Sequence, residues 1–491
     1  MKKELGRFAK HTTIYALGVV LSKAVGFLMI PVYTRLLQPR DYGVLEMLDL
    51  VVFFSGLFAA TGIYSAVFRF YAAFEREEDK KEVIATALLY NGVLSAVVTL
   101  AIICFASQIA GAVLGSTSYS PFVRIVAITL FFSNLSEVPL AYWRAQARTT
   151  LFVAVSFTRT LVALSLNIIA LVLLRWGVQG VLLANLCTNV IAGLALFGVV
   201  AAQVPRRIIS SKLKEMLRYG IPIVPSYLVS FLLTFSDRFF LRHFASLSVV
   251  GVYSLGYKLA GVLAVLVSGP FSMAWSWQQF ELAQEEKGPQ VYAKIQTYRL
   301  FVSLFIGLGI SVFARDVLKI MTTQPYWSAY QVVPLITLSY ILSDVRSVVL
   351  TGILVKKATH YLPLVGLGTA VANALLNYFF ISRYMAMGAA IATVLSYAVH
   401  LILTYVVAQR VQPVPYEYGR SALMLGTATV IYLASTLHNF QLVGSTLVNT
   451  AGLFLFLLIS FKLLDLEERK MLRQATRAVA RRCVAVVRGA L

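Results

Sequence analysis

Apolar runs of about twenty residues follow one another along almost the whole chain, and they limit its fold more than any other feature. A helix of roughly twenty residues crosses the hydrocarbon of a bilayer. Of the 491 residues, 59% are hydrophobic and only 13% are charged, a composition typical of a protein embedded in lipid. The sequence therefore predicts an all-α polytopic membrane protein with about 14 transmembrane helices.

The predicted spans lie from one end of the chain to the other. They cover residues 12–34, 43–66, 83–106, 121–142, 150–174, 178–204, 219–241, 249–276, 295–315, 331–352, 361–381, 387–408, 420–437 and 443–464. The first run follows four basic residues, as in a signal peptide. It is longer than the apolar core of such a peptide and has no clear small-residue cleavage site, so we expect a retained helix.

Basic residues are concentrated in alternate connections between the spans. With the N-terminus inside, most of the 43 Lys and Arg residues fall on the inner side, so the positive-inside rule predicts two cytoplasmic termini. The net charge of +22 then reflects orientation and attraction to anionic headgroups rather than binding of nucleic acid. The tail, residues 465–491, carries Arg469, Arg473, Arg477 and Arg481 at helical spacing. It fits a basic amphipathic helix on the cytoplasmic leaflet or a solvated charged helix.

The sequence gives no support for enzyme chemistry. It contains no P-loop, HExxH or GxSxG motif, and the short outer connections leave no room for an external domain. Cys104, Cys187 and Cys483 have no spacing that would suit a metal. We predict a transporter that is not an enzyme and needs no metal or cofactor.

The chain contains an internal repeat at an offset close to 208 residues. RWGVQGVLLANL from Arg175 aligns with RYMAMGAAIATV from Arg383, Gly43 aligns with Gly251, and LSEV (135–138) aligns with LSDV (342–345). The offset spans an even number of helices, which indicates a parallel repeat about an axis along the membrane normal. The predicted organisation is a lobe of six helices (1–204), a basic cytoplasmic linker (205–218), a second lobe of six helices (219–410), two further helices (411–464) and the tail.

Several charged residues fall inside the apolar spans, where a lipid-facing charge costs at least about 2.5 kcal/mol. We expect them to face a shared cavity or one another. The candidates are the cavity cations Lys23, Arg159, Lys258 and Arg346, and the acids Asp49, Glu137 and Asp344 for ion coupling or pairing. The competing interpretation is structural: buried ion pairs, or snorkelling to the headgroups for residues near span ends, namely Arg124, Arg299, Asp237 and Arg238.

Asp344 and Arg346 pose a question of their own, because they lie two positions apart in one apolar span. On a helix such residues point to nearly opposite sides and cannot neutralise each other. Each needs a partner elsewhere. Basic residues are at least as prominent as acids among the deep charges, which suits an anionic substrate.

Two segments resemble a known family. PVYTRLLQPRDYG (31–43) and TFSDRFFLRHFASLSVVGVYSLGYKLAG (234–261) are similar to Wzx-type flippases of lipid-linked oligosaccharides, the polysaccharide transport branch of the multidrug/oligosaccharidyl-lipid/polysaccharide (MOP) exporter superfamily. The resemblance extends from about residue 9 to residue 462. It implies two six-helix lobes in a V shape around a cavity that opens alternately to each side of the bacterial inner membrane.

The resemblance also implies a substrate and partners. The substrate would be an oligosaccharide on a polyprenyl pyrophosphate, moved outward for synthesis of O-antigen, exopolysaccharide or another surface polymer. Related lipid II flippases use bases on helices 1 and 8, which here would be Lys23 and Lys258. Expected partners are this lipid, anionic headgroups at the tail and the polysaccharide polymerase machinery. Proton or sodium binding at Glu137 or Asp344 would reset the empty carrier.

Three alternatives remain open at the level of sequence. A drug/cation antiporter of the same superfamily would share the topology but favour a cavity rich in carboxylates. An integral-membrane polysaccharide polymerase would usually need a large outer loop. A scaffold subunit would carry the charges without using them.

Overall fold

The structure is a computed structural model that describes residues 26–205, 207–437, 442–463 and 468. These residues form helices joined by short turns. The helices are α2 (Ile30–Leu36), α3 (Pro39–Ala60), α4 (Ile63–Ala73), α5 (Glu77–Cys104), α6 (Ala106–Leu114), α7 (Ser120–Ala145), α8 (Thr149–Ile168), α9 (Gly177–Ala201), α10 (Ser210–Gly220), α11 (Val224–Phe244), α12 (Leu247–Ala260), α13 (Gly269–Leu282), α14 (Gly288–Met321), α15 (Val333–Val349), α16 (Thr351–Val355), α17 (Leu362–Val411), α18 (Tyr418–Thr436) and α19 (Leu442–Lys462).

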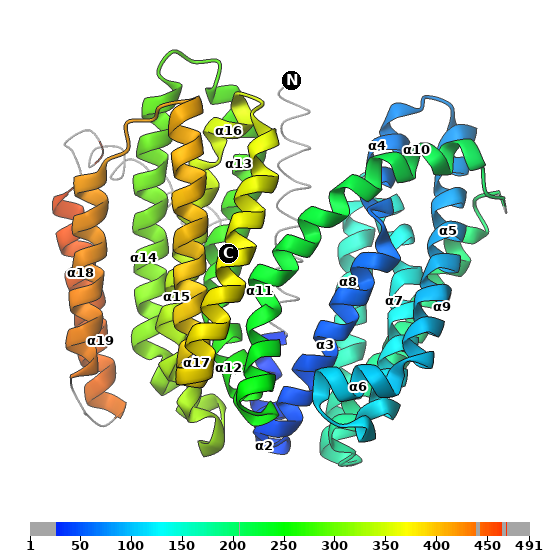
Figure 1. The fold of residues 1–491 in the computed structure, drawn as a ribbon, viewed down its shortest axis with the longest axis horizontal. Helices are drawn as coiled ribbons and strands as arrows, with labels where there is room; N and C mark the ends of the chain where they lie inside the picture. Colours follow the sequence, from blue (N-terminus) through cyan, green and yellow to red (C-terminus); the bar gives the residue numbers. More distant parts are fainter. Residues whose placement is uncertain (1–25, 206, 438–441, 464–467, 469–491) are drawn as a thin grey trace, which may run out of the picture.

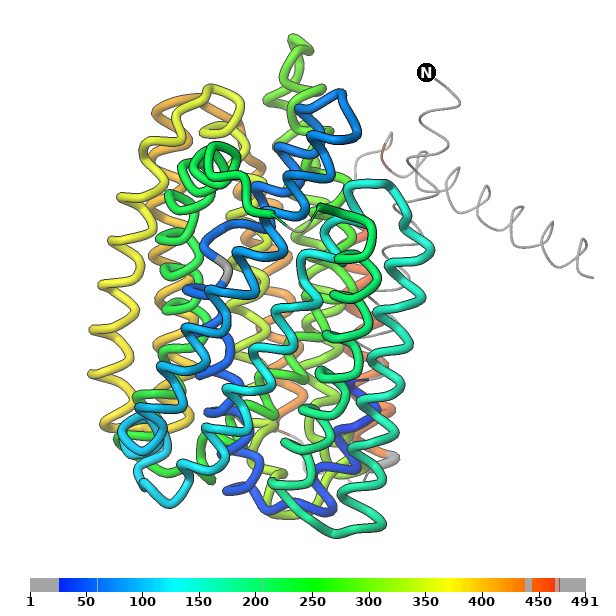
Figure 2. The backbone as a smooth tube through the Cα atoms, turned by 90° about the vertical axis from the view of Figure 1, so that its right-hand side faces the viewer, coloured from blue at the N-terminus to red at the C-terminus, as the bar shows by residue number. Residues whose placement is uncertain are grey.

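The helices form two groups that meet at one end and diverge toward the other, like a V (Figure 1). We call α2 to α9 the first lobe and α11 to α17 the second lobe. The lower end in Figure 1, where the lobes meet, is the closed end, and the upper end is the open end. Figure 2 shows the long helices of both lobes running along one common direction, as helices that cross a bilayer must.

Among the described residues, eleven helical stretches are long and apolar enough to span a membrane. The longest, Thr359–Val411, contains two predicted spans. At Met385 the backbone leaves the helical region (φ 48°, ψ −123°), and Asn373 bonds Ser396 at 3.0 Å, so the two halves of α17 lie side by side. The span predicted at 420–437 corresponds to α18, and most of the first predicted span lies outside the described residues. The count of fourteen stays a prediction.

Two positions 208 residues apart both have a positive φ. Gly177, the first residue of α9, has φ 57°, and Met385, between the two halves of α17, has φ 48°. At Met385 a positive φ is costly because the residue has a Cβ. The helices are thus interrupted at corresponding places in the two lobes, where the sequence repeat was found, although the lobe boundaries remain predictions.

The lobes meet where α3 crosses α12. A Cβ at Gly43 would lie 1.8 Å from the carbonyl oxygen of Leu247, and a Cβ at Gly251 would lie 2.1 Å from that of Pro39. Gly43 and Gly251 are 208 positions apart, and so are Pro39 and Leu247, so the repeat relates the two contacts to each other. Only glycine lets two helix backbones approach this closely, so the aligned glycines of the repeat mark the crossing point.

The predicted linker and the last two helices pack on the outside of the lobes. Lys212 of α10 binds Asp79 at 2.8 Å and Glu82 at 2.7 Å, which holds the linker on the first lobe. The side chain of Phe456 in α19 is fully buried in an apolar cluster with α14 and α18. Glu468 pairs with Arg420 at 2.7 Å. The rest of the predicted amphipathic tail lies outside the described residues.

Gly43→Ala is expected to lower stability by about 1–3 kcal/mol, because the new methyl group overlaps a backbone carbonyl at the crossing. Thermal unfolding of the purified protein in detergent measures this change. Gly198→Ala in α9, where no atom lies within 4 Å of the added Cβ, is the matched control and should leave stability unchanged or slightly higher. Equal stability of Gly43→Ala and the unaltered protein would contradict the close crossing.

Candidate functional site

Asp344 is part of a buried ion pair between α14 and α15. Its carboxylate accepts hydrogen bonds from Arg299 Nη2 at 2.6 Å and from Ser303 Oγ at 2.8 Å. Ser347 also contacts the guanidinium. The Arg299 and Asp344 side chains are only 2% and 4% exposed. Arg299 was expected to snorkel from a span end. It instead lies inside the second lobe because Asp344 offsets its charge.

Arg346 is arranged differently, although it is two residues from Asp344. Its side chain is half-buried, and its Nε is buried without a hydrogen-bond partner. Tyr397 and His400, both on α17, are the polar groups that interact with it electrostatically. Among the described residues, no carboxylate lies within ion-pair distance of Arg346. On α15, therefore, Asp344 belongs to a closed ion pair, whereas Arg346 has no counter-charge among the described residues.

The first lobe has the opposite arrangement at the equivalent positions. At an offset of 207 residues, Asp344 corresponds to Glu137. At the same offset the two arginines have uncharged counterparts, because Arg299 corresponds to Gly92 and Arg346 to Pro139. Glu137 therefore has no matching arginine. Within the described part of the chain it forms no ion pair and interacts with Arg159 and Arg144 only at longer range.

Arg159 binds neutral partners. It donates hydrogen bonds to Ser133 Oγ at 3.2 Å and to Asn189 Oδ1 at 2.5 Å. These contacts hold the guanidinium between α7, α8 and α9 without removing its charge. The first lobe thus places one half-buried base and one half-buried acid in the middle of its helix bundle.

Lys258 lies at the junction of the lobes and already has an acidic partner. Its Nζ is 2.5 Å from Glu46 Oε1 and 2.9 Å from the Tyr42 hydroxyl, both on α3. Asp49 follows one turn after Glu46 and is exposed, although it lies inside a span. Two acids therefore surround one base here, which makes Lys258 a weaker candidate for an anion than Arg346. Lys23 lies outside the described residues.

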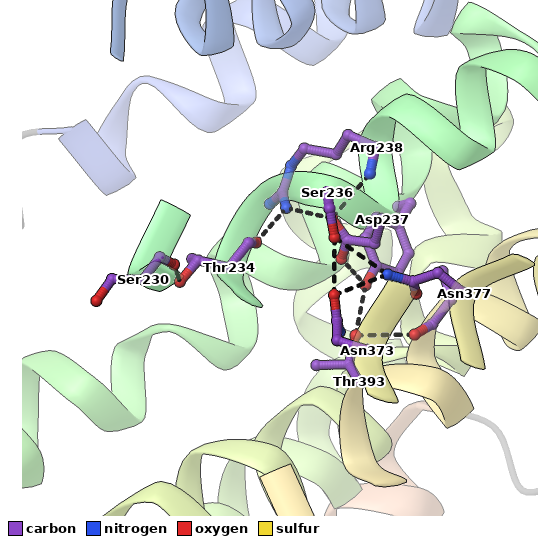
Figure 3. A network of polar contacts seen from close by, with 10 residues as sticks. Ser230, Thr234, Ser236, Asp237, Arg238, Asn373, Asn377 and Thr393 are labelled. Carbon is purple, nitrogen blue, oxygen red and sulfur yellow. Dashed lines mark hydrogen bonds and ion pairs between the residues drawn. The ribbon is translucent and has the colours of Figure 1, made fainter. Parts of the chain in front are cut away.

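A polar network fills the second lobe between α11, α12 and α17 (Figure 3). Ser236 Oγ donates to Asn373 Oδ1 at 2.8 Å, and Asn377 Nδ2 donates to both. Next to it, Arg238 pairs with Asp237 at 2.9 Å, and the Tyr253 hydroxyl donates to Asp237 at 2.6 Å. Their position near a span end had suggested that Arg238 and Asp237 snorkel to the headgroups. Both side chains are instead buried in the second lobe.

Local sequence patterns do not show which of these charged residues are partners. The pairing of Arg299 with Asp344 joins residues 45 positions apart on different helices. The contact of Glu46 with Lys258 joins helices of different lobes, so it depends on how the lobes cross. The comparison of Gly92 with Arg299 across the repeat does show from sequence that Glu137 has no arginine at the position corresponding to Arg299.

Comparison with known proteins places the chain in a family. Residues 32–331 match the family described as "Polysaccharide biosynthesis protein", and the chain belongs to it. A curated relative, "Lsg locus putative protein 1" of Haemophilus influenzae (strain ATCC 51907 / DSM 11121 / KW20 / Rd), is 23% identical over 268 residues, which is 52% of this chain and 62% of the relative. The chain thus spans about three fifths of the length of that relative.

Solved structures show the same fold. Lipid II flippase MurJ, in an inward closed conformation, has a TM-score of 0.74 at 13% identity and covers 92% of this chain and 99% of its own. An inward-facing multidrug resistance MATE family transporter of the MOP superfamily has a TM-score of 0.63 at 15% identity, over 81% of this chain and 97% of its own. The resemblance found in the sequence is confirmed, and so is the all-α, V-shaped fold.

Asp344→Asn is expected to lower stability by about 3–5 kcal/mol, because it leaves the Arg299 charge buried without a counter-charge. The double variant Arg299→Met with Asp344→Leu should recover most of this loss. Arg346→Met, which removes a guanidinium without a carboxylate partner, should cost less than about 1 kcal/mol. Thermal unfolding in detergent compares the three. An Arg346→Met variant as unstable as Asp344→Asn would mean that Arg346 is a structural residue.

Proposed function

We propose that the protein moves an anionic, polyprenyl-pyrophosphate-linked oligosaccharide from the cytoplasmic to the outer leaflet of the inner membrane, by alternating access. The observation that carries this proposal is Arg346, a cation inside a membrane span whose guanidinium has no carboxylate partner among the described residues. Such a group is costly in hydrocarbon unless water or a ligand offsets it. A guanidinium matches the bidentate geometry of phosphate oxygens.

The position of Arg346 supports entry from the open end. It lies nine residues before Val355, the end of its span, which corresponds to about 14 Å of helix rise. We place the open end at the cytoplasm, because the basic connections gather there and both termini are predicted on that side. A pyrophosphate that enters between the diverging lobes would reach Arg346 without passing the closed end.

Arg346 would bind the pyrophosphate together with Lys23, while Arg159 in the first lobe would contact the glycan or a second anionic group. The prenyl chain would stay in the lipid. The membrane potential is negative inside, so it favours outward movement of an anion. For about two negative charges, the gain is roughly 2.3 kcal/mol per charge per 100 mV. Export of the loaded carrier is therefore electrically downhill.

The return of the empty carrier leaves cations in the membrane without their anion. Glu137 is the acid best placed to take part, because it forms no ion pair among the described residues and lies within electrostatic range of Arg159. Asp344 is a poorer candidate because Arg299 and Ser303 already occupy its oxygens. We propose that Glu137 takes up a proton or a sodium ion during the return step.

The polysaccharide polymerase machinery would accept the flipped lipid at the outer face. A drug/cation antiporter is the second candidate, since the fold also matches a multidrug transporter. It is less well supported, because the charge without a counter-charge in the second lobe is basic.

Arg346→Ala is expected to slow translocation by about tenfold or more, the effect of losing one charge-assisted contact. The assay uses liposomes that contain the protein and a labelled polyprenyl-pyrophosphate oligosaccharide, and it follows exposure of the label to an external glycosidase. Lys23→Ala should act in the same direction. Arg383→Ala is the matched control, because that guanidinium stacks on Phe379 of its own helix. Unimpaired translocation by Arg346→Ala would refute the proposed role, and transport of a soluble cation alone would favour the antiporter.

Glu137→Gln is expected to remove the dependence of repeated turnover on an imposed ion gradient, because the amide cannot gain or lose a proton. Translocation rates in liposomes with and without proton and sodium gradients measure this effect. Asp344→Asn, tested at a temperature where it is folded, is the comparison variant. A gradient response in Glu137→Gln equal to that of the unaltered protein would exclude Glu137 as the coupling residue.

A further inference from the structure

The closed end contains a charged contact between the lobes that the proposed transport steps have not used. Arg242 of α11, in the second lobe, donates from Nε to the carbonyl oxygen of Leu114 at 3.0 Å. Leu114 is the last residue of α6 in the first lobe, and the last carbonyls of a helix lack partners within it. A cation is stabilised there by the helix dipole.

Gly115 is shaped to receive this guanidinium. It follows Leu114 with φ 78°, in the left-handed region that favours glycine. A Cβ at this position would lie 1.1 Å from Arg242 Nη2. Glycine is therefore required twice, once by the backbone turn that ends α6 and once by the arginine of the other lobe.

The internal repeat contains a related contact on the other side of the crossing. The hydroxyl of Thr34 on α2 donates to the carbonyl of Ile30 in its own helix at 2.8 Å. Its Oγ1 also lies 3.4 Å from the carbonyl oxygen of Met321, the last residue of α14. Thr34 precedes Arg242 by 208 positions, and Leu114 precedes Met321 by 207. In each case a side chain from one lobe reaches the end of a helix in the other, as in an interface with two-fold symmetry. One copy is neutral and the other is charged.

Other contacts across the closed end also use backbone acceptors. Thr323 Oγ1 donates to the carbonyl of Thr34 at 2.9 Å, and the Tyr326 hydroxyl donates to that of Leu37 at 3.0 Å. Water can replace neutral hydrogen bonds of this kind with little net change in free energy. Hydrogen bonds from a charged donor are roughly twice as strong, so Arg242 favours closure more than these neutral contacts do, as does the ion pair of Lys258 with Glu46 at the crossing.

We propose that Arg242 is a positioning residue that holds the closed end shut, and that opening of this end withdraws its guanidinium from Leu114 and Gly115. This inference rests on the proposed alternating access. Arg242 does not bind substrate in this scheme. It sets the fraction of molecules in which the closed end is shut, and thus the resting conformation of the carrier before substrate binds.

Distance measurements between spin labels test the inference independently of transport. The full chain, with Cys104, Cys187 and Cys483 replaced by serine, carries labels at Ser118→Cys and Ser328→Cys, two exposed positions beside the closed end in the first and second lobes. Pulsed electron paramagnetic resonance in lipid nanodiscs measures the distances between the two labels. The ratio of short to long distances reports the ratio of shut to open molecules at this end. We expect Arg242→Gln to lower this ratio about tenfold, Gly115→Ala to lower it in the same direction, and Arg242→Lys to fall between.

Arg383→Gln is the control, because its guanidinium contacts Phe379 in its own lobe, and its ratio should equal that of the unaltered protein. Unchanged ratios in Arg242→Gln and Gly115→Ala would overturn the inference. If Arg242→Gln does not fold, Arg242→Lys and Gly115→Ala decide in its place. The liposome assay separates the two proposals: shifted distances without any translocation of the lipid-linked oligosaccharide refute the proposed function alone, whereas translocation with unshifted distances refutes the role of Arg242 alone.

Discussion

The cost of a charge in hydrocarbon governs how this structure is built. An ionisable side chain inside a span must find an opposite charge, polar partners, water or a ligand. Arg299 and Arg238 meet that condition with carboxylates in the second lobe, and Lys258 meets it with Glu46 across the lobes. Among the described residues, Arg346, Arg159 and Glu137 lie inside spans and form no ion pair, which is why the proposed function rests on them.

The two lobes use one backbone design with different charges. The turn before the last long helix and the glycine at the crossing recur at an offset of 208 residues. The charges near the middle of the bundle do not recur, because the pair Arg299 and Asp344 has Gly92 and Glu137 as its counterpart. Among the described residues, the duplicated frame therefore presents Arg346 without a counter-charge in the second lobe, and Glu137 and Arg159 without an ion pair in the first. In the proposed function, the acid for the coupling ion thus lies in a different lobe from Arg346.

Much of the fold could be predicted from the sequence, because the length of the apolar runs and the positions of the basic residues respond directly to the bilayer. The repeat was also visible, since Gly43, Gly251, Arg175 and Arg383 share one register. The state of each charge could not be predicted in the same way. Whether Asp344 neutralises Arg299 or a ligand depends on how α14 and α15 rotate about their axes, and the hydropathy of an almost uniformly apolar helix does not encode that rotation.

The backbone acceptors at the closed end have a consequence for how such proteins diversify. Substitution of the side chains of Leu114, Thr34 or Leu37 in the first lobe does not delete their carbonyl groups, so these three acceptors persist as long as the backbone keeps its course. The donors of these three bonds are side chains of the second lobe. Substitutions in the second half of the chain can thus strengthen or weaken these three contacts without any change in the first half.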